Sequence, residues 1–94
     1  MSNYTIWKKE LQFWGTNRVV LPKDAEVLHV AGQHNRICVW FRCIPDDPLH
    51  YDERTFAVVG TGVPAPPPSE SKYLGTAMID GGAHVLHVFE RIKP

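Results

Sequence analysis

Hydrophobic and polar residues alternate along short stretches of this chain with the two-residue period of β-strands. The period, together with many β-branched and aromatic residues, predicts six or seven strands at intervals of about ten residues. No stretch repeats apolar residues at i, i+3, i+4 and i+7 over the dozen positions that an amphipathic helix requires. The predicted strands are residues 4–13, 18–21, 26–31, 36–44, 53–59, 73–79 and 83–92.

Glycine, proline and aspartate separate these strands. Pro22 is predicted to end the second strand, and G-Q-H-N at 32–35 and D-G-G at 80–82 are predicted hairpin connections. Residues 45–52 hold two prolines and three aspartates and are predicted to be a loop. Residues 60–71 hold four prolines, which predict a stiff, extended surface loop within the domain.

The pattern as a whole predicts an all-β fold. We expect one domain over residues 1–94, built as a small antiparallel barrel or sandwich. The tetrad V-L-H-V occurs twice, at 27–30 and 85–88. Strand alternation would place the first valine and the histidine of each copy on one face and the leucine and second valine on the other. We therefore expect the two copies to be two strands of one sheet.

Composition narrows the possible partners. Hydrophobic residues make up 44% of the 94-residue chain, and ten basic residues offset ten acidic ones. Binding to bulk nucleic acid usually requires a basic excess that neutralises phosphates, so we do not expect it here. The N-terminus lacks the apolar region of a signal peptide, and no apolar run is long enough to span a membrane. Unpaired edge strands leave a homo-oligomer possible.

Catalytic and metal-binding patterns are weak in this sequence. His84 and His87 lie three apart on a predicted strand, so they point to opposite faces and cannot share a metal. The glycines around Thr61 precede prolines, which excludes the helix of a dinucleotide-binding motif. Cys38 and Cys43, five apart, also face opposite sides and should be reduced thiols. We expect no enzyme activity, cofactor or metal.

Aromatic and arginine residues are the remaining candidates for a ligand-binding site. Alternation over 36–44 separates Ile37, Val39, Phe41 and Cys43 from a second set that holds Trp40 between two arginines. Arginine beside tryptophan can hold a phosphate or stack a base, and a packed sheet rim is the alternative interpretation. The predicted ligand-binding residues are Arg36, Arg42 and Arg54 for phosphate, Trp40 or Tyr73 for stacking, the backbone of Gly60, Thr61 and Gly62 for an anion, and His84.

Several motifs together resemble a known family. They are V-L-P-K-D-A-E-V-L-H-V, I-C-V-W, R-T-F-A-V-V-G-T-G-V-P, Y-L-G-T and G-G-A-H-V-L-H-V-F-E, and they extend from Arg18 to Glu90. They resemble a family of small, uncharacterised phage and prophage proteins, a domain of unknown function. The resemblance implies a phage origin and a compact β-fold, and it brings no catalytic residues. Residues 3–16 lie outside the matched part.

The resemblance and the missing catalytic pattern suggest a binding protein. We expect it to counter host defence in the host cytoplasm, either by sequestering a nucleotide immune signal or by blocking a host effector protein. A structural or assembly role in the virion is the alternative. A small hydrolase acting through histidine is a third hypothesis.

Overall fold

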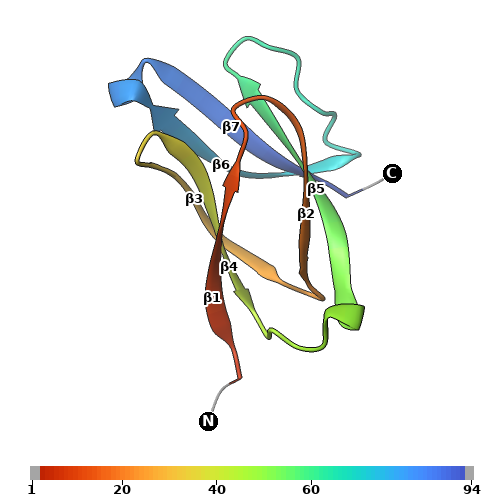
Figure 1. Ribbon diagram of the computed structural model, residues 1–94. Coiled ribbons are helices and arrows are strands. Elements are labelled where there is room, and N and C mark those ends of the chain that lie inside the picture. Colours follow the sequence, from red (N-terminus) through yellow and green to blue (C-terminus); the bar gives the residue numbers. More distant parts are fainter. Residues whose placement is uncertain (1–2, 93–94) are drawn as a thin grey trace.

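The computed structural model describes residues 3–92, which form two antiparallel β-sheets packed against each other (Figure 1). The three-stranded sheet has the order β1 (Thr5–Leu11), β4 (Arg36–Cys43), β3 (Glu26–Gln33). The four-stranded sheet has the order β2 (Gly15–Pro22), β5 (Tyr51–Gly60), β7 (His84–Arg91), β6 (Ser71–Ile79). The all-β prediction is confirmed, with two separate sheets. The barrel alternative is wrong.

The core lies between the two sheets. On β4 the residues Ile37, Val39, Phe41 and Cys43 are buried and face inward, as the alternation predicted. Phe41 meets Phe56 of β5 edge-on, with ring centroids 5.9 Å apart. Burying each side chain of this size stabilises the fold by roughly 1.5–3 kcal/mol, so this layer contributes substantially to the packing of the two sheets.

Two glycines let neighbouring edges of the sheets touch. A Cβ atom on Gly32 of β3 would lie 2.3 Å from the carbonyl oxygen of Met78 on β6. A Cβ atom on Gly75 of β6 would lie 2.8 Å from the Cβ of Val30 on β3. Larger residues would push the two strands apart.

The two hairpin turns beyond these glycines are tied together by side chains. Asn35, in the turn between β3 and β4, donates from Nδ2 to Oδ1 of Asp80 over 3.2 Å. Asp80, in the short 3₁₀ turn Asp80–Gly82 between β6 and β7, donates its backbone N–H to Oδ1 of Asn35 over 3.1 Å. This pair of bonds holds one end of the two sheets together.

Strand ends differ from the predicted ones where pairing extends a strand. β2 pairs with β5 from Gly15 opposite Val58 to Pro22 opposite Tyr51. The strand thus begins before residue 18 and includes its proline, which is tolerated because β2 is an edge strand. β5 likewise begins in the predicted loop 45–52, whose other feature is the 3₁₀ turn Pro48–His50.

The turn between β3 and β4 is shorter than predicted. His34 and Asn35 both have positive φ, 52° and 59°, as in the two-residue turn of a tight hairpin. Gly32 and Gln33, expected in the connection, therefore pair within the sheet, opposite Ile37 and Arg36.

The two V-L-H-V tetrads lie in different sheets, so the prediction of one shared sheet is wrong. The first is in β3 and the second in β7. The register of β3 against β4 shifts between Val27 and His29. This β-bulge at Leu28 turns Val27 toward the core and His29 outward, so in the first copy the two do not share a face. The second copy keeps the expected alternation.

Residues 61–70 connect β5 to β6 and carry the four prolines. The segment is anchored at its ends, where the Val63 N–H donates to the Gly60 carbonyl over 3.2 Å and the Ser71 hydroxyl donates to the Pro67 carbonyl over 2.9 Å. Within residues 3–92, none of the helical turns is long and apolar enough to cross a membrane.

Candidate functional site

The outer face of the three-stranded sheet gathers three of the predicted ligand residues. Arg36, Trp40 and Arg42 project outward from the central strand β4, with Cys38 between the first two. We call this surface the arginine face. Trp40 is half-buried, and its indole lies against the imidazole of His29, with ring centroids 5.7 Å apart.

Each arginine that was predicted to bind phosphate has a glutamate beside it. Arg36 lies 3.9 Å from Glu10 and Arg42 donates from Nε to Glu26 over 2.9 Å, both pairs being exposed. An anionic ligand on the arginine face would compete with these carboxylates for the two guanidinium groups.

Arg54 is not on the arginine face. It lies on the inner side of β5 and donates to both oxygens of Glu90, over 2.6 and 2.8 Å, and to the carbonyl of Ala25. Its guanidinium also lies 6.0 Å from the ring centroids of Phe41 and Phe56. Arg54 therefore closes one end of the core, and its donors face protein groups.

Cys38 is covered by the side chains of the arginine face. Lys8 donates to Oε1 of Gln33 over 2.7 Å, and this bond spans β4 between Trp40 and Arg36. Burial raises the pKa of the Cys38 thiol, an effect that Lys8 partly opposes. Burial likewise raises the pKa of the Cys43 thiol, which lies in the core. Neither thiol is poised as a nucleophile at neutral pH.

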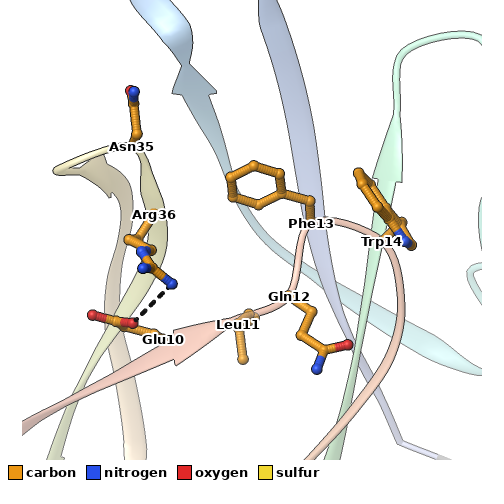
Figure 2. Close-up of a pocket in the computed structure, with 7 residues that line it drawn as sticks. All are labelled: Glu10, Leu11, Gln12, Phe13, Trp14, Asn35 and Arg36. Atoms are coloured by element: carbon orange, nitrogen blue, oxygen red, sulfur yellow. Dashed lines mark ion pairs between the residues drawn. The ribbon is translucent and has the colours of Figure 1, made fainter.

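A cavity of about 650 Å³ opens beside the arginine face, between the β1–β2 connection and the turn after β3 (Figure 2). We call it the Trp14 cavity. Trp14 is 74% exposed and stands at one side, while Arg36 and Glu10 stand at the other. Phe13 lies between them and packs partly against the core, with its ring 6.0 Å from the indole. Arg36 thus belongs to both the cavity and the arginine face.

A chain of hydrogen bonds crosses the outer face of the four-stranded sheet. His87 of β7 contacts Oγ1 of Thr61 through Nε2 over 2.8 Å and Oγ1 of Thr76 through Nδ1 over 2.9 Å. Thr76 in turn contacts the hydroxyl of Tyr73 over 2.5 Å. We call these four residues the His87 chain. It joins the G-T-G turn, Y-L-G-T and the second V-L-H-V tetrad, which are far apart in the sequence.

The remaining predicted residues take two different places. Gly60 ends β5, Thr61 and Gly62 begin the proline segment that follows it, and Tyr73 lies in β6 of the same sheet. His84 begins β7, exposed, with Nε2 3.9 Å from Asp80. The structure therefore brings Arg36, Trp40 and Arg42 together, and separately Thr61 and Tyr73. It does not bring all nine predicted residues into one site.

Sequence reasoning missed four of the residues that make these surfaces: Trp14, Glu10, Thr76 and His87. Trp14 is one of the aromatic residues that favour binding surfaces, but no spacing or motif in the sequence connects it with Arg36, and its place between two predicted strands is the local sign of its exposure. Thr76 and His87 stand in motifs that the resemblance already singled out, but the pairing of β6 with β7 was needed to place them side by side.

Among residues 3–92, no group of three or more histidine, cysteine, aspartate or glutamate side chains could hold a metal ion. A family model described as "Domain of unknown function (DUF7352)" matches residues 2–94. The comparisons with curated proteins and with solved structures gave no match.

Proposed function

We propose that this chain, which belongs to the family of the domain of unknown function DUF7352, is a phage-encoded binding protein that blocks a host effector protein of anti-phage defence. The Trp14 cavity is its contact surface. The resemblance of its motifs to small phage and prophage proteins supports the phage origin. Between the two expected modes of action, the surroundings of the arginines favour a protein partner over a nucleotide.

The exposed indole of Trp14 carries this proposal. It is 74% exposed at the side of a concave surface, next to the aromatic ring of Phe13. Covering an indole with a partner would remove on the order of 150 Å² of apolar surface from water, worth about 3–4 kcal/mol. Tryptophan and arginine are also the residue types that most often dominate binding energy at protein interfaces.

Charge argues against the nucleotide. Arg36 and Arg42 each have a glutamate partner on the surface, and the chain as a whole has a formal net charge of zero. A phosphate would meet the repulsion of Glu10 or Glu26 as well as the attraction of the arginine. A protein partner can instead cover such exposed ion pairs as part of a polar rim around the aromatic centre.

The test is protection of a defence-sensitive phage in a host that expresses the chain. We expect expression to raise the plaque count on a host with the defence system. Trp14→Ala should lower that gain, because the loss of at least about 1.4 kcal/mol of binding weakens the affinity for the partner about tenfold or more. Leu49→Ala is the matched control, because Leu49 is 87% exposed and lies outside the cavity.

Both variants should unfold at the temperature of the parent chain, since neither side chain is buried. Equal protection by the parent and Trp14→Ala would contradict the proposed surface. A rise in melting temperature with cyclic di- or trinucleotides would favour nucleotide sequestration instead. Detection of the chain in purified virions, without any effect on plaque counts, would favour the structural or assembly alternative.

A further inference from the structure

The His87 chain holds one hydrogen atom more than it uses. With a neutral imidazole, its three hydroxyl groups and one ring N–H supply four hydrogens, whereas three hydrogen bonds join its members. One hydrogen therefore remains that can be donated to a group outside these four residues.

Which end offers that donor depends on the tautomer of His87. If Nδ1 carries the proton, Thr76 accepts from it, and the free hydrogen lies at this end of the network: on Tyr73 when Thr76 donates to Tyr73, or on Thr76 when Tyr73 donates. If Nε2 carries the proton, Tyr73 and Thr76 donate toward Nδ1, and the hydroxyl hydrogen of Thr61 is released. One end of the His87 chain, at Thr61 or at Tyr73 and Thr76, thus donates a hydrogen bond, while the other end keeps lone pairs that can accept one. A change of tautomer exchanges these roles.

The side chains that flank the His87 chain in the sheet register are uncharged. The register places Met78 opposite Val85, Tyr73 opposite Phe89 and Val59 opposite His87, all on the outer side of the sheet. Tyr73 is 56% exposed and its ring meets that of Phe89 edge-on, with centroids 5.5 Å apart. These side chains offer no cation to a phosphate and no carboxylate to an ammonium group. Arg91, the next residue of β7 on this face after Phe89, lies opposite Ser71, and the uncharged part of the face ends there.

We propose that this face, around the His87 chain, is a second binding site, and that its ligand is a saccharide ring. A sugar hydroxyl both donates and accepts, which matches the two ends of the chain. The C–H groups of a sugar ring are apolar and can lie on the exposed rings and methyl groups beside them. The site is on the opposite side of the sandwich from the arginine face and does not depend on the protein partner proposed above.

The experiment is a titration of the full chain with methyl β-glucoside and with N-acetylglucosamine, followed by NMR of backbone amides and of the imidazole nitrogens. A neutral ligand of this size binds in the millimolar range, so the titration extends to about 100 mM. We expect saturable shifts at Thr61, Tyr73 and the ring of His87 with at least one of the two sugars. Sorbitol, which has no ring, should produce only weak shifts that do not saturate.

Thr61→Val keeps the shape of the side chain and removes its hydroxyl, so it should weaken sugar binding at least about fivefold. Thr5→Val on β1 makes the same change on the other sheet and should leave binding unchanged. The proposal is overturned if neither sugar gives saturable shifts, if Thr61→Val binds as the parent does, or if sorbitol or inorganic phosphate gives the same shifts at His87.

Discussion

The two V-L-H-V tetrads are identical in sequence, yet their leucines and histidines meet different surroundings. Residues 27–30 lie in β3, at an edge of the three-stranded sheet, and residues 85–88 lie in β7, between β5 and β6. Leu28 occupies a bulge and is 42% exposed, whereas Leu86 is 9% exposed and belongs to the core. His29 lies against Trp40, whereas His87 is hydrogen-bonded through both ring nitrogens.

Each tetrad is also followed or preceded by a glutamate that pairs with an arginine. Glu26, before the first, meets Arg42 at the exposed edge of the sheet, and Glu90, after the second, meets Arg54 at the end of the core. The position of each strand in its sheet, together with the bulge at Leu28, therefore determines which side chains of the tetrad are buried and what they contact.

We expect the greatest loss of stability from a substitution that separates β3, which carries the first tetrad, from β6 of the other sheet. Gly32→Ala would place a Cβ atom 2.3 Å from the Met78 carbonyl oxygen, and backbone cannot move aside as a side chain can. We expect a loss of about 4 kcal/mol in the free energy of unfolding, measured by urea denaturation.

Gly60→Ala is the control for that experiment, because its Cβ atom would meet only Val63 at an ordinary 3.7 Å. It should cost less than about 1 kcal/mol. If both substitutions have the same small effect, the close approach of β3 and β6 does not hold the sheets together.

The two leucines test the difference in burial between the tetrads. Leu86→Ala should lower the free energy of unfolding by about 3 kcal/mol, because it removes methyl groups from the core and leaves a cavity. Leu28→Ala should cost less than about 1 kcal/mol, since much of that side chain is already in water. Equal losses in thermal or urea unfolding would contradict the difference in burial between Leu28 and Leu86.

The arginines give the smallest expected difference. Arg54→Ala leaves Glu90, only 13% exposed, without its partner, and we expect a loss of about 2 kcal/mol, below the cost for a fully buried pair. Arg42→Ala breaks an exposed pair and should cost no more than about 1 kcal/mol. Finding Arg42→Ala as harmful as Arg54→Ala in chemical denaturation would contradict the different roles of the two glutamates.

The sequence was sufficient for the features that depend on local alternation. The inward set of β4, the all-β class and the hairpin between β6 and β7 follow from period-two patterns and turn residues. Pairing between distant strands could not be read in the same way, because nothing local records that β2 lies beside β5 or that β3 and β7 belong to different sheets. The bulge at Leu28 left no distinct residue type to mark it, and so its faces were assigned wrongly.

The candidate sites show the same division. Arg36, Trp40 and Arg42 were grouped correctly because they alternate along one strand. Glu10 and Glu26 come from the flanking strands, so their effect on those arginines depended on pairing across the sheet. The His87 chain is built from three segments that are far apart in the sequence. Thr61, Tyr73 and the second tetrad were each noted in the sequence, but their hydrogen bonds could not be predicted without the strand pairing.

The strand order also constrains assembly during synthesis. The three-stranded sheet needs nothing beyond Cys43, so it has all its strands before half of the chain has been made. β2 is made before two of those strands, yet its partner β5 ends only at Gly60, and β6 and β7 follow later still. Residues up to Cys43 therefore include every strand of one sheet and also β2, whose partner β5 is made later. The strands that cover the inner face of the three-stranded sheet, apart from β2, are all made after it.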